Sequence, residues 1–186
     1  MRKIVFAVLL AAGAAFCAEV WTPQLALKVH SVSSVVPSPD GKFVVYAQSW
    51  AEMEGERSET VTHLFLARAD GSGELQLTRG EKSCDQPQWS PDGKWILFLS
   101  SRGGKNDLWR IRADGGEAER LTESKVDLGG FKVSPDGKQV AFLAPDPPLP
   151  EKEKAQKEKR DFRVIDQEPE DHRLWLIPLE ADGKGK

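Results

Sequence analysis

The hydrophobic positions of this chain fall into short runs that are bounded by Pro, Asp and Gly. Phe43–Tyr46, Trp95–Leu99 and Val140–Leu143 are rich in β-branched, aromatic and aliphatic residues. Such runs are typical of β-strands joined by tight turns. Ile96–Leu99 is apolar without a break, whereas a strand with one wet face alternates. We therefore expect this strand to be covered on both faces.

The pentapeptide Ser-Pro-Asp-Gly-Lys precedes each of these runs. Its copies are Ser38–Lys42, Ser90–Lys94 and Ser134–Lys138, and their starts lie 52 and 44 residues apart. Pro presets φ for the first central position of a type I turn, Asp can accept hydrogen bonds from nearby backbone, and Gly adopts the positive φ that follows. A repeat of about 40–50 residues is typical of propellers and solenoids.

A second turn follows each run, at Ala69–Gly71, Ala113–Gly115 and Ala181–Gly183. In the first two units this turn leads into a short segment that ends in Leu-Thr. Each unit thus contains four antiparallel strands, which make one propeller blade. We predict an all-β fold, a partial β-propeller of about three four-stranded blades. An open β-solenoid is the alternative, and the two tight turns per unit disfavour it.

The first 18 residues have the pattern of a secretory signal peptide. A basic start is followed by the apolar stretch Ile4–Phe16 and by small residues near a cleavage point. This stretch has thirteen residues, whereas about 20 are needed to span a bilayer. We expect cleavage after Cys17 or Ala18, secretion or a periplasmic location, and no membrane segment afterwards. A lipid anchor on Cys17 is an alternative that the bulky Phe16 disfavours.

The repeat divides the chain into a signal peptide and three blades. We assign 1–18 to the signal peptide, 19–80 to the first blade with its lead-in, 81–123 to the second blade and 124–186 to the third. Propellers close with about four to eight blades, and the third blade is incomplete at its C-terminus. We therefore expect a fragment of a longer protein, a truncated gene product, or a short chain that assembles with other copies.

Two segments interrupt the repeat. The first blade carries an insertion at Ala51–Thr60, and the third carries a longer, charged one at 145–171, in which Glu153 and Lys157 favour a short helix. We interpret both as solvated extensions of hairpins. The alternative is that they border a substrate entrance or contact a partner domain, because functional residues are frequent on loops held by a rigid scaffold.

Charge and cysteine content exclude several classes of function. Loss of Arg2 and Lys3 with the signal peptide would change the formal net charge from -3 to -5, because two positive charges are removed. The mature chain is therefore mildly acidic and has no basic stripe for nucleic acid. Cys84 would remain, with Cys17 at most, so no intramolecular disulfide framework is expected. We interpret Cys84 as a structural residue at the start of a strand.

Candidate catalytic and metal-binding residues are scarce. No Ser lies in a Gly-x-Ser-x-Gly segment, and the sequence has no zinc spacing, EF-hand loop or phosphate-binding glycine loop. His30, His63 and His172 lie far apart and are interpreted as structural. The Asp residues of the repeated turns could be imagined as calcium ligands, but their role in the turn explains them. We predict no catalytic residue, no cofactor and no metal site.

Tryptophan residues occur at equivalent strand positions in the repeats. Trp89, Trp95, Trp109 and Trp175 are predicted to lie in the core between blades. A carbohydrate-stacking platform is the alternative, and it would require these rings to be exposed.

Several segments together resemble the start of secreted bacterial peptidases of the prolyl oligopeptidase family, in the acylaminoacyl-peptidase and dipeptidyl-peptidase branch. The matching segments are Trp21–Val29, Val35–Val45, Gln88–Lys94, Ala113–Ala118 with Leu121-Thr122, Asp161–Val164, and His172–Trp175. The Ser-Pro-Asp-Gly repeats alone would fit TolB-type propellers equally well. The N-terminal run and the insertion of the third blade favour the peptidase family.

The resemblance implies that the propeller and the catalytic domain have different roles. In that family an N-terminal propeller caps a C-terminal α/β-hydrolase domain, restricts access to short peptides, and leaves the Ser-Asp-His triad to the hydrolase domain. No position here matches the triad, so this chain alone is expected to lack peptidase activity. Some relatives bind the amino terminus of the substrate through acidic residues of the propeller, but Glu52, Glu54 and Glu56 do not align with such a motif.

Three functional hypotheses follow. The first is the gating portion of a secreted serine peptidase that acts on peptide substrates, with a hydrolase domain as its partner. The second is a TolB-like periplasmic propeller that binds proteins and has no enzymatic activity. The third is a glycan-binding or lyase propeller. An open array of blades would also expose apolar faces and strand edges, so the isolated chain is expected to be poorly soluble or oligomeric.

Overall fold

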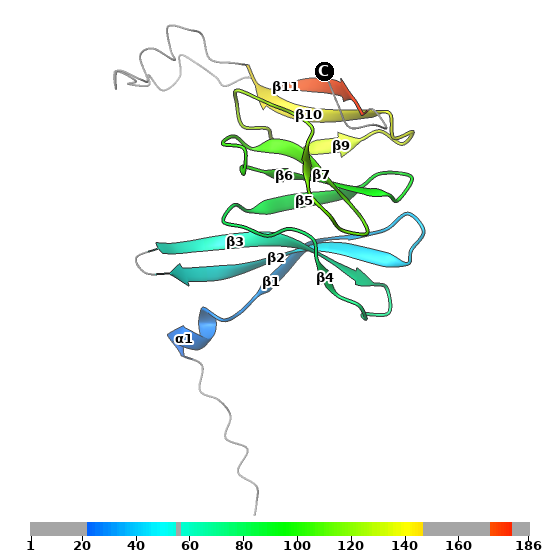
Figure 1. Ribbon diagram of the computed structural model, residues 1–186. Coiled ribbons are helices and arrows are strands. Elements are labelled where there is room, and N and C mark those ends of the chain that lie inside the picture. Colours follow the sequence, from blue (N-terminus) through cyan, green and yellow to red (C-terminus); the bar gives the residue numbers. More distant parts are fainter. Residues whose placement is uncertain (1–21, 55–56, 147–171, 180–186) are drawn as a thin grey trace, which may run out of the picture.

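Three antiparallel β-sheets are stacked face to face in the computed structural model, which describes residues 22–54, 57–146 and 172–179 (Figure 1). The strand order is β1-β2-β3-β4 in the first sheet, β5-β6-β7-β8 in the second and β11-β10-β9 in the third. The all-β fold of four-stranded blades predicted from the sequence is confirmed. The third sheet has three described strands.

The elements follow the predicted order of long strands, tight turns and short outer strands. Their bounds are α1 Pro23–Ala26, β1 Ser31–Pro37, β2 Phe43–Glu54, β3 Arg57–Arg68, β4 Leu75–Gln76, β5 Cys84–Trp89, β6 Trp95–Ser100, β7 Asp107–Arg112, β8 Glu119–Arg120, β9 Phe131–Val133, β10 Gln139–Pro145 and β11 His172–Pro178.

Each Ser-Pro-Asp-Gly-Lys turn is closed by the same hydrogen bonds. In the first copy the Ser38 hydroxyl donates to Asp40 Oδ1 at 2.7 Å, and the backbone N–H of Lys42 donates to the same oxygen at 3.1 Å. The N–H of Phe43 donates to Ser38 Oγ at 2.9 Å. Gly41 has a φ of 71°, which a residue with a Cβ adopts only with strain. The turn chemistry predicted from the sequence is therefore confirmed.

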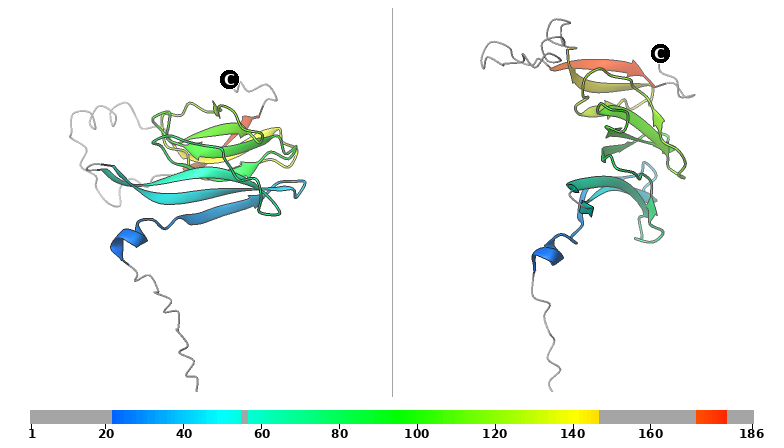
Figure 2. Two further views of the ribbon diagram at one scale, coloured as in Figure 1. Left: turned by 60° about the horizontal axis from the view of Figure 1, so that its bottom comes forward. Right: turned by 60° about the vertical axis from the view of Figure 1, so that its left-hand side comes forward.

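The shorter insertion, Ala51–Thr60, lengthens a hairpin. The pairing of β2 with β3 runs without a break from Phe43 opposite Arg68 to Glu54 opposite Arg57. This hairpin extends beyond the other sheets in two orientations of the molecule (Figures 1 and 2). The interpretation of this insertion as a hairpin extension is thus confirmed. Residues 147–171 of the longer insertion, the 1–18 segment and the turn at 181–183 lie outside the described residues.

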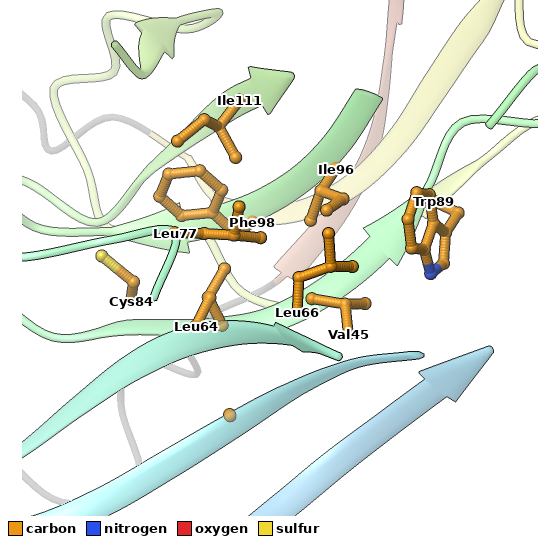
Figure 3. Close-up of a cluster of buried hydrophobic side chains, with 10 residues drawn as sticks. Val45, Leu64, Leu66, Leu77, Cys84, Trp89, Ile96, Phe98 and Ile111 are labelled. Atoms are coloured by element: carbon orange, nitrogen blue, oxygen red, sulfur yellow. The ribbon is translucent and has the colours of Figure 1, made fainter. Parts of the chain in front are cut away.

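The core lies between the sheets. Side chains of β2, β3, β5, β6 and β7 form one cluster between the first and second sheets (Figure 3). A second cluster lies between the second and third sheets. Strand β6 contributes to both, because Ile96 and Phe98 belong to the first cluster and Leu97 and Leu99 to the second. Both faces of β6 are therefore covered, as its unbroken apolar run predicts.

Candidate binding cleft and interfaces between the sheets

The repeated turns contact one another from sheet to sheet. A Cβ atom built on Gly93 would lie 3.8 Å from Cδ of Pro39, and one built on Gly137 would lie 3.4 Å from Cδ of Pro91. The Pro of each turn thus lies beside the Gly of the next turn. Because both contacts use the same two motif positions, the turns form a column along one rim of the stack.

Polar side chains of β5 also connect neighbouring sheets. The indole N–H of Trp89 donates to the carbonyl oxygen of Val36 at 3.1 Å, in the first sheet. The side-chain amide of Gln88 donates to the carbonyl oxygen of Phe131 at 2.6 Å, in the third sheet. These bonds satisfy backbone groups of the inner strands, which a buried edge would otherwise leave unpaired.

The inner strands β1 and β5 share a bulge. Their pairing with the second strand shifts between Ser33 and Val36 in the first sheet and between Asp85 and Gln88 in the second. Ser34 and Gln86 each precede the turn Ser by four residues, and their φ angles are 50° and 51°. A bulge adds local twist and removes ladder hydrogen bonds. It leaves room for the inter-sheet bonds of Gln88 and Trp89.

The Leu-Thr pair after each short outer strand has a structural role. Thr78 Oγ1 accepts a hydrogen bond from the N–H of Leu64 at 2.9 Å and lies 3.4 Å from Nδ1 of the buried His63. In the second sheet, Thr122 Oγ1 accepts from the N–H of Leu108 and donates to the buried Asp107. His63 and Asp107 therefore occupy equivalent positions.

The structure brings together two histidines that are distant in sequence. The ring centroid of Trp50 lies 5.3 Å from that of His30 and 5.4 Å from that of His63. Burial lowers the pKa of His63 below its ordinary value of 6.5, and the charge of Arg102 lowers it further. His172 lies apart from them in sequence and fold, in the exposed strand β11. The hydrogen-bonded surroundings of His63 agree with a structural role.

Over residues 22–54, 57–146 and 172–179, no group of three or more His, Cys, Asp and Glu side chains could hold a metal ion. In the same described ranges, no helix is both long and apolar enough to cross a membrane. Cys84 is fully buried in the first core cluster, and its sulfur lies 2.8 Å from Nη2 of Arg102. Glu52 lies in the long hairpin, opposite Glu59.

A cleft of about 670 Å³ lies between the first and second sheets, at the rim that carries the turns. Its floor is apolar and includes Phe43, Leu66, Leu75 and Trp89. The volume falls within the range of about 300–1,000 Å³ that is usual for ligand sites. Sequence inspection did not reveal this cleft, because its walls come from strands of two different repeats.

Charged side chains line the edge of the cleft. They include Asp40, Asp92, Asp114 and Arg68, and Asp40 pairs with Lys42 at 3.4 Å while Asp114 pairs with Arg112 at 2.9 Å. The Ser38 hydroxyl lowers the pKa of Asp40, and the Ser90 hydroxyl does the same for Asp92. The Arg112 guanidinium lowers the pKa of Asp114. All three side chains therefore carry a full negative charge at neutral pH.

Comparison with known proteins identifies the fold family. The family model of the PD40 TolB β-propeller domain matches residues 26–173. The chain belongs to the TolB β-propeller family.

Relatives of this propeller include peptidases and TolB-like proteins. Dipeptidyl-peptidase 5 of Porphyromonas gingivalis is 39% identical over 87 residues, which are 47% of this chain and 12% of that protein. A TolB-type protein of Agrobacterium tumefaciens is 32% identical, with a TM-score of 0.52 over 80% of this chain and 45% of that one. Acylaminoacyl peptidase of Pyrococcus horikoshii shares the fold at 16% identity, with a TM-score of 0.61 over 88% of this chain and 25% of that one.

These relatives confirm the resemblance inferred from the sequence motifs. The propeller is related both to the propeller regions of peptidases and to TolB. The segment that matches dipeptidyl-peptidase 5 corresponds to about an eighth of that relative, since it covers 12% of it.

The outward face of the third blade exposes positions that are buried in the other blades. Leu108 in β7 is 0% exposed, whereas Leu174, at the same position of β11, is 67% exposed. Leu99 and its equivalent Leu143 differ in the same way, at 0% and 42%. In the first two blades the next blade covers these positions. This face of the third blade is therefore apolar and exposed.

The outward face of the first blade shows the same contrast. Val32 and Val35 in β1 are 57% and 60% exposed. Their equivalents in β5, Cys84 and Pro87, are fully buried against the first blade. Each end of the described stack thus exposes apolar side chains whose equivalents are buried between blades.

The prediction that the tryptophans lie in the core between blades is confirmed for Trp89, Trp95 and Trp109 and is wrong for Trp175. Trp89 is buried, and Trp95 and Trp109 pack against the core clusters. Trp175 is 43% exposed, because it lies in β11, the edge strand of the described third sheet. Its equivalent Trp109 is covered by the guanidinium groups of Arg102 and Arg120, at 5.2 and 6.0 Å from the ring centroid.

Proposed function

We propose that this chain is the propeller part of a secreted or periplasmic serine peptidase of the prolyl oligopeptidase family. The main support is the 39% identity to dipeptidyl-peptidase 5 over 87 residues. The propeller would admit short peptides to a catalytic α/β-hydrolase domain of the full-length protein. Peptide hydrolysis itself would belong to that domain, since this sequence has no Gly-x-Ser-x-Gly segment.

The distribution of loops supports a gating role. The long β2–β3 hairpin joins the second strand of the first blade to the third. It therefore extends from the rim opposite the repeated turns. Loops on one rim of a rigid scaffold are well placed to border an entrance. The exposed leucines of the third blade are in turn suited to contact a further blade of the same propeller.

The experiment has two parts. The first determines whether the reading frame that encodes this chain also encodes a Gly-x-Ser-x-Gly segment. The second compares the complete gene product with residues 19–186 alone, using blocked dipeptide and tripeptide chromogenic substrates and a long unfolded protein such as reduced casein.

We expect the complete product to cleave the short substrates at least about tenfold faster per bond than the long one, and residues 19–186 to cleave neither. Replacement of the nucleophilic Ser provides the control for contaminating peptidases. An active enzyme that cleaves casein as fast as dipeptides would contradict the gating role. A gene without any hydrolase segment would overturn the peptidase assignment. Mass spectrometry of the secreted product would locate signal-peptide cleavage near Cys17 or Ala18.

A TolB-like binding propeller is the second candidate function. Its support is the 32% identity to the TolB-type protein of Agrobacterium tumefaciens, with a TM-score of 0.52. This function predicts further blades, no hydrolase domain, and specific protein partners in the periplasm. Affinity capture from an envelope extract tests it, and a variant changed at the exposed end faces is the control. If no protein is captured by the unchanged chain and lost with the variant, this function is contradicted.

A further inference from the structure

Asp-Gly pairs recur along the chain, and each pair that the structure describes lies in a turn. The described pairs are Asp40-Gly41, Asp70-Gly71, Asp92-Gly93, Asp114-Gly115 and Asp136-Gly137, whereas Asp182-Gly183 lies outside the described residues. In such a pair the glycine nitrogen can attack the side-chain carboxyl of the aspartate, because glycine has no Cβ that hinders the approach. All five described aspartates are exposed, so access to water does not distinguish them.

The attacking nitrogen has similar surroundings in all five turns. Each Gly N–H donates to the carbonyl oxygen three residues earlier, at 2.8–3.0 Å. Each Gly has a positive φ, between 69° and 94°. The pKa of each carboxyl is lowered, chiefly by a hydrogen bond from a side chain. The reactivity of the five pairs therefore depends on how firmly each carboxyl is held in place.

Four of the carboxyls are held by a serine hydroxyl and a backbone N–H. In the repeated turns, Oδ1 accepts from the Ser hydroxyl at 2.5–2.7 Å and from the Lys N–H at 3.0–3.1 Å, at Asp40, Asp92 and Asp136. Asp70 Oδ1 accepts from the N–H and the hydroxyl of Ser72, at 2.9 and 2.7 Å. Hydrogen bonds to a carboxylate are stronger than neutral ones. Two of them on one oxygen oppose rotation of the carboxyl.

The carboxyl of Asp114 is held differently. No serine hydroxyl of the described residues bonds to it, because Gly116 stands where Ser72 stands in the first blade. Its two oxygens accept instead from Nε and Nη2 of Arg112, at 2.9 and 3.1 Å. Both side chains are more than half exposed, and such a surface pair contributes little and is screened by salt. Asp114 can therefore turn toward the nitrogen of Gly115 more easily than the other four aspartates.

We propose that Asp114 is a site of spontaneous conversion to isoaspartate. The Gly115 nitrogen forms a bond to Cγ of the protonated Asp114 carboxyl, and the hydroxyl of that carboxyl leaves with the proton of the nitrogen as water. The succinimide ring that results then takes up water. Cleavage of its bond between the nitrogen and the α-carbonyl carbon leaves the main chain running through Cγ. The residue keeps its mass and charge, but the main chain gains one methylene group.

This conversion changes a contact between the first two blades. Asp114 lines the cleft, and a Cβ built on Gly115 would lie 3.9 Å from Cδ2 of Leu75. A longer main chain at this turn shifts the edge of the cleft relative to the first blade. The modification goes beyond the proposed gating function and does not depend on it, because it requires only the chemistry of the turn.

Incubation of the full-length protein at mildly acidic pH for several weeks tests the proposal. Mass spectrometry with electron-transfer fragmentation distinguishes isoaspartate from aspartate at each pair. We expect Asp114 to convert severalfold faster than Asp70, Asp92 and Asp136. In guanidinium chloride the rates should become similar, because the turns that hold the carboxyls are lost. Added sodium chloride should accelerate conversion of the folded protein at Asp114 and leave the other sites unchanged, since it screens the pair with Arg112.

Two variants locate the cause. Ser72→Gly gives the first blade the Asp-Gly-Gly sequence of the second and removes the hydroxyl that holds Asp70. We expect the conversion rate of Asp70 to rise toward that of Asp114. Asp114→Glu adds a methylene group to the side chain, so that attack by Gly115 would have to form a larger and less favourable ring. We expect no conversion at this turn in that variant.

The proposal is overturned if Asp92 or Asp136 converts as fast as Asp114 in the folded protein. It is also overturned if Asp114 converts in guanidinium chloride but not in the folded protein. An unchanged rate at Asp70 in Ser72→Gly would show that the hydroxyl does not protect the carboxyl, and would contradict the argument. Ser72 is exposed, so this variant should fold, and near-UV circular dichroism verifies it.

Discussion

The second and third blades carry nearly the same strand sequence, which is buried in the second blade and exposed in the third. Leu-Trp-Arg-Ile at 108–111 in β7 and Leu-Trp-Leu-Ile at 174–177 in β11 occupy the same position of the blade. Leu108, the first residue of this run in β7, is fully buried, whereas its counterpart Leu174 in β11 is mostly exposed. Burial of these strands is therefore decided by the neighbouring blade and not by the strand's own sequence.

Leucine-to-alanine substitutions provide the strongest test of this contrast. Leu108→Ala should lower the free energy of unfolding by about 2–5 kcal/mol, because it removes buried methyl groups and leaves a cavity. Leu174→Ala, the matched control, should change it by less than about 0.5 kcal/mol, as is usual for exposed positions. Urea unfolding followed by circular dichroism measures both. Equal losses would show that β11 is as well covered as β7.

A smaller effect is expected at the indole bond between the first two blades. Trp89→Phe removes the N–H that donates to Val36, and it should destabilise the chain by about 1 kcal/mol, the net value of a typical hydrogen bond plus a small packing loss. Trp175→Phe makes the same change at an exposed ring and should be nearly neutral. If the two substitutions have the same effect, the inter-blade bond contributes nothing.

The pH dependence of stability tests the burial of His63. The pKa of His63 is lowered in the folded chain, mainly by burial, from the ordinary 6.5. The unfolded chain therefore binds a proton first as the pH falls. Stability is highest above pH 6.5 and should decline from there toward the lower folded pKa.

Unfolding midpoints measured from pH 8 to pH 5 should reveal this decline in the wild type. His63→Gln lacks this group and should show a shallower decline. A slope that does not differ between the two proteins would exclude His63 as the cause.

The smallest effect on stability is expected at the end face of the third blade. Leu174→Lys together with Leu176→Lys should leave the unfolding free energy almost unchanged, because both side chains are exposed. The same pair of changes should reduce self-association of residues 19–186 severalfold, since it adds charge to an apolar face. Light scattering at several concentrations measures this. If self-association is unchanged, the contact between copies of the chain lies on another surface.

Short-range sequence patterns predicted much of the fold. The Ser-Pro-Asp-Gly turn is defined by residues within five positions of one another, so Ser38, Asp40 and Phe43 could be assigned from sequence. The unbroken run Ile96–Leu99 also revealed that β6 is covered on both faces. These features depend on backbone geometry and short-range hydrogen bonds, which each repeat contains in full.

The cleft and the end faces could not be predicted in this way. The cleft is lined by residues of two repeats, such as Phe43 and Trp89, so it exists only once two blades are packed together. Trp175 resembles Trp109 in sequence, and its exposure depends on groups that lie outside its own strand. The approach of His30 and His63 to Trp50 likewise arises from tertiary packing.

The column of Pro and Gly contacts along the rim of the turns has a consequence for engineering. Pro39 with Gly93 and Pro91 with Gly137 bring successive turns close together at one edge of the stack. At the opposite edge, the β2–β3 hairpin is several residues longer than its counterpart between β6 and β7, and a core cluster joins the sheets in both cases. Foreign peptide loops grafted between the second and third strands of a blade should therefore be displayed without altering the spacing between the sheets.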